Sequence, residues 1–132
     1  MENMSDIKKD LIRKSNAIKR TVKEFNYYIK DVENEQKKLK KMEDDKENKG
    51  DIKRQSDYVQ ECEGAKKSTY KTLTKNYGPL EEIINKIETP SQDEEMQKIY
   101  EEIKELPEFA EAKEHLSAAK QIIDSEKATY SE

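Results

Sequence analysis

Residues 4–39 read MSDIKKDLIRKSNAIKRTVKEFNYYIKDVENEQKKL. Within this stretch an apolar side chain recurs at every seventh position, in the order Met4, Leu11, Ile18, Phe25, Val32 and Leu39. Such a repeat places these side chains on one face of a long α-helix, at the d positions of coiled-coil heptads. The pattern predicts a helix over about residues 5–47, which ends before Gly50, a residue that readily adopts the left-handed conformation.

The next stretch carries a second seam with the same period. Its a positions hold Ile52, Val59, Lys66, Leu73, Leu80 and Ile87, and its d positions hold Gln55, Cys62, Thr69, Asn76 and Ile83. This pattern predicts a helix over about residues 51–88, capped by Asp51, with thin packing where the seam is polar. Gly78 and Pro79 fall inside it, and proline removes a helical hydrogen bond. We therefore expect a kink or short break at residues 78–79 that keeps the same face buried.

A third apolar stripe follows Pro90. It consists of two sets that are one position out of phase and meet at Pro107: Met96, Ile99, Ile103 and Leu106, then Phe109, Ala112, Leu116, Ala119 and Ile123. Ser91 with Glu94, and Thr89 with Gln92, fit a capping box at the start of this stripe. The pattern predicts a helix over about residues 91–127 with a kink or restart at residue 107.

The short connections near residues 48–51 and 88–91 force neighbouring helices to run antiparallel. The predicted fold class is therefore all-α: an elongated, antiparallel, coiled-coil-like three-helix bundle with up-down-up topology and kinks near Pro79 and Pro107. It forms a single three-helix domain over residues 1–132. A monomer can bury all three stripes. A dimer of one open helix is the alternative, and Gly50 and Pro90 argue against it.

The residue types needed for catalysis or metal binding are scarce. His115 is the only histidine, and a histidine without His or Cys neighbours is a poor metal ligand. Cys62 is the only cysteine, and its d position predicts a small buried thiol. No glycine-rich phosphate-binding motif occurs, and the many carboxylates lie on open helix faces where no pocket would shift their pKa. We therefore expect a protein that is not an enzyme, with no catalytic residue, no cofactor and no metal.

Charged residues make up 42% of the chain and are unevenly distributed. Residues 1–75 carry 20 Lys and Arg against 15 Asp and Glu, whereas residues 76–132 carry 6 against 15. This polarity indicates either solvated helix faces or an electrostatic docking surface for a protein partner. The tyrosines beside the seams, which are Tyr28, Tyr58, Tyr70, Tyr77 and Tyr100, are explained either by edge packing or by partner contact.

Two further classes of partner are disfavoured. The overall charge of −4, with only three arginines and with lysines interleaved among acids, argues against nucleic acid. No stretch approaches the ~20 apolar residues of a membrane span, and the first residues contain no signal-peptide core. We therefore expect a soluble, cytoplasmic protein without a membrane partner.

Residues 18–24, IKRTVKE, resemble the Val-Lys-Arg-x-Val-Lys-Glu stretch in helix 1 of the tubulin-binding cofactor A family. Tyr28 matches a tyrosine four residues after that glutamate. The connector of residues 43–50 has the length found in the family, and residues 51–55, DIKRQ, are similar to the start of its helix 2. The similarity needs no gap from Ala17 to Cys62. It weakens further on, where this chain is about 20 residues longer than is usual in the family.

The resemblance implies a three-helix chaperone that captures β-tubulin after the chaperonin, without nucleotide hydrolysis, and passes it on toward α/β heterodimer assembly. It implies β-tubulin as partner, other tubulin-folding cofactors as further partners, and a cytoplasmic, cytoskeleton-associated location. Contacts are expected on helix surfaces, at the exposed residues of the matched block: Lys19, Lys23, Tyr28, Lys30, Lys53 and Arg54. The alternative is a generic coiled-coil scaffold or adaptor that self-associates through its stripes.

Overall fold

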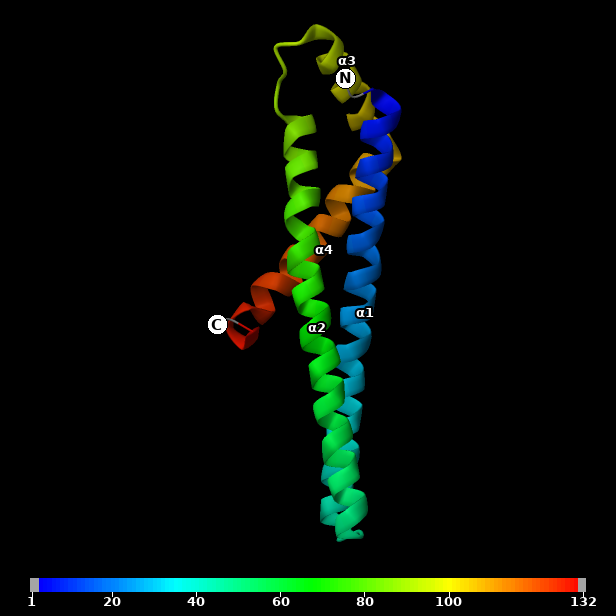
Figure 1. Cartoon of the computed structure of the whole chain (residues 1–132), viewed down its shortest axis with the longest axis vertical. Helices are drawn as coiled ribbons and strands as arrows, with labels where there is room; N and C mark the ends of the chain where they lie inside the picture. The colour runs from blue at the N-terminus through cyan, green and yellow to red at the C-terminus, as the bar shows by residue number, and fades with distance from the viewer. Residues whose placement is uncertain (1–2, 131–132) are drawn as a thin grey trace. The chain divides into compact units, whose positions relative to one another are not determined.

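The computed structural model describes residues 3–130, which form four α-helices (Figure 1). α1 spans Met4–Asp44, α2 spans Lys49–Glu88, α3 spans Glu94–Lys104 and α4 spans Pro107–Tyr130. The predicted all-α class is confirmed, with α1 and α2 as two long helices that pack antiparallel to each other. The third helix of the sequence-based prediction is instead divided into two, α3 and α4.

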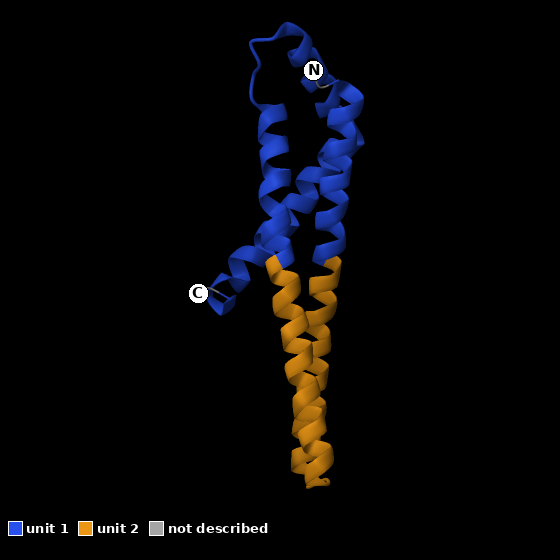
Figure 2. Cartoon of the chain, in the orientation of Figure 1, with its two compact units in different colours: residues 1–22, 72–132 blue, residues 23–71 orange. Residues whose placement is uncertain are grey.

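The chain forms two compact units (Figure 2). Unit 1 comprises residues 1–22 and 72–132, and unit 2 comprises residues 23–71. α1 and α2 therefore each contribute one segment to each unit. The single domain over residues 1–132 stays a prediction.

Unit 1 contains most of the buried apolar side chains, and all four helices contribute to its core. The buried members are Ile7, Leu11, Ile18, Leu73, Leu80, Ile84, Ile87, Tyr100, Ile103, Phe109, Ala112 and Ala119. Two ion pairs also connect α4 to the long helices. Lys8 Nζ lies 3.6 Å from Glu108 Oε2, and Lys113 Nζ lies 2.8 Å from Glu88 Oε2. Both pairs are solvent-accessible, so the apolar core supplies most of the stabilisation of unit 1.

Unit 2 has the thinner and more polar seam that the sequence predicts. Its buried hydrophobic side chains are Phe25, Val32, Val59, Cys62 and Tyr70. Gln55 and Thr69 are also buried, and both are hydrogen-bonded. The Gln55 amide donates to the backbone oxygen of Glu35 (3.0 Å) and to its Oε2 (2.7 Å), while the Thr69 hydroxyl donates to the Ala65 carbonyl (2.9 Å). These partners offset the cost of burying polar atoms.

The connection between α1 and α2 comprises residues 45–48 instead of the expected 48–50, because α1 ends at Asp44 and α2 begins at Lys49. Lys46, with φ of 54°, adopts the left-handed conformation expected of Gly50. Gly50 instead lies in the first turn of α2, and its N–H donates to Asn48 Oδ1 (2.7 Å). Asn48 thus serves the capping role that was predicted for Asp51.

Pro79 lies inside α2, which is continuous from Lys49 to Glu88. The phase of the seam explains this continuity. Leu73, Leu80 and Ile87 follow one another at seven-residue intervals and are all fully buried, so an uninterrupted helix keeps each of them in the core of unit 1. A break at residues 78–79 would bring no gain in burial that could offset the lost helical hydrogen bonds.

Pro107 has the opposite effect, because the apolar stripe changes phase there. A continuous helix would turn Ala110 and Lys113 toward the core, whereas the break buries Phe109 and Ala112. Pro107 is the first residue of α4, a position where its missing N–H costs nothing.

The start of α3 also differs from the prediction. Asp93 is the cap, and its Oδ1 accepts from the N–H groups of Glu95 (3.0 Å) and Met96 (3.2 Å). Ser91, one of the predicted caps, instead accepts the N–H of Asp93 on its hydroxyl (3.2 Å). The other predicted cap, Thr89, donates its hydroxyl to the Asn85 carbonyl at the end of α2 (2.7 Å). Three polar residues at alternate positions, 89, 91 and 93, could each have capped the helix, and the local turn selects the last of them.

Candidate functional site

Within residues 3–130, no three or more His, Cys, Asp or Glu side chains gather in a way that could hold a metal ion. Over the same residues, no helix combines the length and the apolar character needed to cross a bilayer. The residues predicted to bind a partner lie on helix surfaces. The lysine and arginine side chains on these surfaces differ in whether a nearby acidic side chain pairs with them.

Cys62 is a buried thiol in the seam of unit 2, as predicted. Burial raises the pKa of this thiol, and the carboxylate of Asp31 raises the pKa further. Because the thiolate is the reactive form, both effects suppress reaction at neutral pH. Cys62 therefore serves packing and not chemistry.

We expect Cys62 in the native protein to react with a disulfide reagent at pH 8 at least ~100-fold more slowly than in the unfolded chain, because it must be both uncovered and ionised. Because the pKa is raised, the native rate should go on climbing with pH beyond the ordinary thiol pKa of 9.0 instead of levelling off there. The measurement is release of the chromophore with and without denaturant. Cys62→Ser, which removes the only thiol, gives the blank. Equal native and unfolded rates at pH 8 would contradict the assignment.

Three lysines follow the outer side of α1 in unit 2. Lys23, Lys30 and Lys37, called here the lysine row, are seven residues apart, so they share one side of the helix at intervals of about 10 Å. All three are exposed, and within residues 3–130 none of them makes a hydrogen bond or an ion pair. Their positive charge is therefore not satisfied by this chain and is available to a partner.

Tyr27 lies beside the lysine row. It follows Lys23 by four residues and precedes Lys30 by three, which places all three side chains on adjoining parts of one helix surface. Tyr27 is 62% exposed, the highest value for a large hydrophobic residue among residues 3–130. Its ring meets the half-buried Tyr28 edge-on, with 5.3 Å between centroids and an interplanar angle of 74°. Tyr28, which the family resemblance indicates, thus packs against Tyr27, which no sequence pattern had indicated.

A shallow groove of about 580 Å3 lies elsewhere on unit 2, between the end of α1 and the start of α2. Met42 and Tyr58 supply its apolar surface, and its charged lining includes Arg54. The charge of Arg54 is compensated within α2, because its guanidinium lies 3.0 Å from Asp51 Oδ1. Lys53 is compensated in the same way by Asp57 Oδ2 at 3.5 Å.

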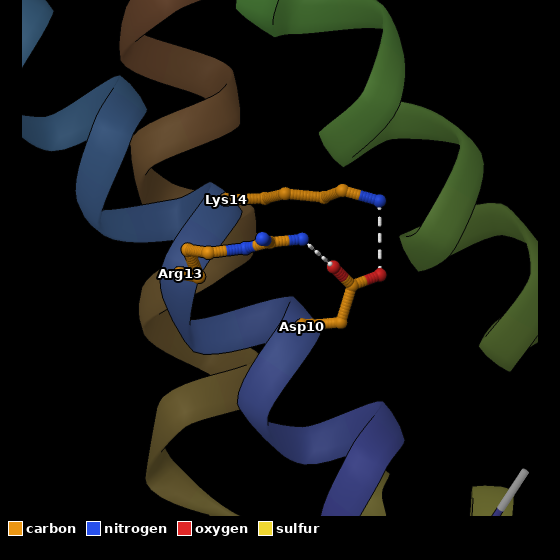
Figure 3. A network of polar contacts seen from close by, with 3 residues as sticks. All are labelled: Asp10, Arg13 and Lys14. Atoms are coloured by element: carbon orange, nitrogen blue, oxygen red, sulfur yellow. Dashed lines mark hydrogen bonds and ion pairs between the residues drawn. The ribbon is translucent and has the colours of Figure 1, made fainter.

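Two basic side chains near the start of α1 in unit 1, Arg13 and Lys14, are also paired within their own helix. Asp10 accepts hydrogen bonds from the Arg13 guanidinium (2.6 Å) and from Lys14 Nζ (2.9 Å), as Figure 3 shows. The bond from Lys14, supported by Arg13, lowers the pKa of the Asp10 carboxyl. This network borders a cleft of about 440 Å3 that Ile7, Pro79 and Tyr100 also line. Asp10 pairs with both cations. This region therefore differs from the lysine row, whose charges have no partner within residues 3–130.

The family model of tubulin binding cofactor A matches residues 6–103. This chain belongs to the tubulin binding cofactor A family. The match covers α1 and α2 and nearly all of α3, whereas α4 lies beyond it. Comparisons with curated proteins and with solved structures find no match. Membership of the tubulin binding cofactor A family, a family of non-catalytic chaperones, supports the role of a β-tubulin folding cofactor.

All six residues predicted to bind a partner lie inside the span matched by the tubulin binding cofactor A family. Lys23 and Lys30 share one side of α1 in unit 2, whereas Tyr28 lies on a different side of the same helix segment and Lys19 belongs to unit 1. Lys53 and Arg54 are exposed on α2 but are ion-paired with acids of the same helix. Within unit 2, the α1 residues are therefore the stronger candidates for contacts with tubulin.

Proposed function

We propose that this tubulin binding cofactor A family member captures β-tubulin after its release from the chaperonin and passes it on toward assembly with α-tubulin. The proposed contact surface is the outer side of α1 in unit 2. The observation that supports it is the row of three exposed lysines that have no hydrogen-bond or ion-pair partner within residues 3–130. Since β-tubulin is strongly acidic, such lysines would steer the encounter and raise the association rate.

The remaining features agree with this role. The apolar seams are buried within each unit, so we propose that the protein acts as a monomer in the cytoplasm, alongside the cytoskeleton and the other tubulin-folding cofactors. A self-associating scaffold would instead have to expose one of these stripes. Within residues 3–130, the large hydrophobic residues that are exposed are two tyrosines, Tyr27 and Tyr58.

Reversal of the charge at two positions of the lysine row tests the proposal. We expect the double substitution Lys23→Glu and Lys30→Glu to weaken capture of β-tubulin about 10-fold or more at low salt, mainly through a slower association rate. The helical circular dichroism should be unchanged, because both side chains are exposed and make no hydrogen bond or ion pair within residues 3–130. Capture is measured as retention of β-tubulin without α-tubulin in an affinity pull-down from cytosol.

A matched control keeps the same change in net charge. Lys98→Glu with Lys127→Glu alters two exposed lysines of α3 and α4 in unit 1, and this pair should leave capture within twofold of the wild type. Light scattering should give the monomer mass of 15.5 kDa for all variants. If the α1 reversal captures β-tubulin as well as the control does, the lysine row is not the contact surface. If the wild type captures none, the proposed partner is wrong.

A further inference from the structure

Tyr27 is the most exposed large hydrophobic residue of the described chain, and nothing in the packing of unit 2 requires an aromatic ring at this position. It occupies the outermost side of α1, two residues after the fully buried Phe25. An exposed aromatic ring loses little conformational entropy when a partner covers it, since only two side-chain torsions are fixed, and tyrosine is enriched at the energetic centres of interfaces. The exposure of Tyr27 therefore points to a contact outside this chain.

The position of Tyr27 is supported from within the helix. The edge-on contact with Tyr28, at 5.3 Å between ring centroids, limits the orientations that the Tyr27 ring can take. Tyr28 is itself half-buried, so it provides a fixed surface and not a second mobile ring. A ring that is held in place before binding loses less entropy on association.

Charges around Tyr27 are arranged asymmetrically. Lys23 and Lys30 flank the ring on one side, and neither has a partner in residues 3–130. Glu24 and Asp31 lie on its other side by helical spacing, and Asp31 acts on the thiol of Cys62 across the seam. A partner that covers Tyr27 therefore encounters positive charge along one edge of the ring, which defines where its own carboxylates must lie.

Tyr58 provides an internal comparison, because it is the other exposed large hydrophobic residue, at 45%. Its surroundings are mixed in charge, with more acids than bases. Asp31 and Glu35 both raise the pKa of the Tyr58 hydroxyl, after a larger effect from Cys62. The groove beside it is lined by Asp51, Asp57 and Glu61 as well as by Lys38 and Arg54, and Arg54 is ion-paired with Asp51. An acidic partner would therefore gain less there than beside Tyr27, so the two exposed tyrosines of unit 2 differ in the charge of the partner that they fit.

We propose that Tyr27 is the anchor of the tubulin-binding surface. Its ring inserts into an apolar depression of an acidic protein surface, whose carboxylates on one side of that depression pair with Lys23 and Lys30. This inference rests on the proposed capture of β-tubulin and adds the residue at the centre of the contact. The lysines set the association rate and the orientation of the partner, and the buried ring sets the lifetime of the complex.

The test measures association and dissociation rates of β-tubulin with immobilised full-length protein. Tyr27→Ala should raise the dissociation rate about 10- to 100-fold, in the range found for aromatic anchors, with little change in the association rate. Tyr27→Phe should stay within about threefold of the wild type, because the ring is retained. Tyr58→Ala, the matched control on the acidic side, should bind like the wild type. Alanine is a better helix former than tyrosine, so the helical signal should persist in both alanine variants.

The outcomes separate the two proposals. If the wild type binds β-tubulin and Tyr27→Ala binds it within twofold, the anchor is wrong while the function stands. If Tyr58→Ala loses as much affinity as Tyr27→Ala, the assignment of the acidic partner to the Tyr27 side is overturned. If the wild type shows no binding, the proposed function itself fails. A loss confined to Tyr27→Ala, and not shared by Tyr27→Phe, supports the anchor.

Discussion

Phe25→Ala is expected to lower the free energy of unfolding by about 3–5 kcal/mol, the range for complete removal of a buried phenylalanine side chain. Phe25 is fully buried in unit 2. Its ring lies 6.4 Å from that of Tyr70 at 52°, and Lys66 Nζ lies 5.7 Å from its centroid. Unit 2 has few other large buried side chains. The residues around Phe25 can therefore fill little of the cavity that removal of its ring leaves.

Denaturant-induced unfolding, followed by helical circular dichroism, gives the measurement for Phe25→Ala. Tyr27→Ala serves as the control, because it removes an aromatic ring two residues away that is 62% exposed, and it should change the stability by less than about 0.5 kcal/mol. A loss below about 1 kcal/mol for Phe25→Ala would show that the seam of unit 2 is looser than its contacts indicate.

The second large effect has the opposite sign. Pro79→Ala is expected to raise the free energy of unfolding by about 1–3 kcal/mol, since proline inside a helix costs about 3 kcal/mol relative to alanine. Alanine restores an N–H that can donate to the carbonyl of Lys75, one turn earlier. The side chain of Pro79 is exposed, so its removal leaves no cavity in the core of unit 1.

Thermal and denaturant unfolding of Pro79→Ala would be compared with Gly78→Ala. A methyl group at Gly78 meets no atom within 4 Å, so this control should gain only the propensity difference of about 0.5–1 kcal/mol. A Pro79→Ala variant that is less stable than the wild type would contradict the expectation. It would mean that α2 needs the local bend that proline imposes.

The two internal prolines show what sequence periodicity can and cannot decide. The seam keeps its phase across Pro79 and changes phase at Pro107, and both facts are legible in the spacing of Leu73, Leu80 and Ile87 against that of Ile103 and Phe109. Where the apolar stripe has the same phase on both sides of a proline, a continuous helix keeps both parts buried. Where the phase shifts, a break in the helix allows both parts to be buried. An interruption of the helix was predicted at each proline. The helix ends only before Pro107, because burial of the apolar stripe on both sides of Pro79 outweighs one missing hydrogen bond.

Caps were harder to predict than seams. Asn48 and Asp93 each stand among several residues that could accept a backbone N–H, and the choice depends on turn geometry that spacing does not encode. The polar seam residues Gln55 and Thr69, by contrast, were placed correctly, because the heptad repeat fixes which side of a helix faces its neighbour.

The candidate site was only partly accessible from the sequence. Lysines at every seventh position indicated a basic stripe, and helical spacing already separates Lys53, which has Asp57 four residues on, from Lys23, which has no acid three or four residues away on either side. Tyr28 was selected by resemblance, whereas Tyr27 was passed over because its heptad position normally faces solvent. Its one sequence signal is an aromatic residue at helical spacing between two lysines.

The buried amide of Gln55 has a consequence for how the two segments of unit 2 align along their lengths. Its two bonds to Glu35 fix one axial register of α1 against α2. A shift of the helices by one heptad would move the amide away from both acceptors and leave it buried and unpaired, at a cost of about 1–3 kcal/mol. The apolar repeat alone would tolerate that shift, so this polar side chain adds to the short connection at residues 45–48 in excluding the slipped alignments that a repetitive seam otherwise permits.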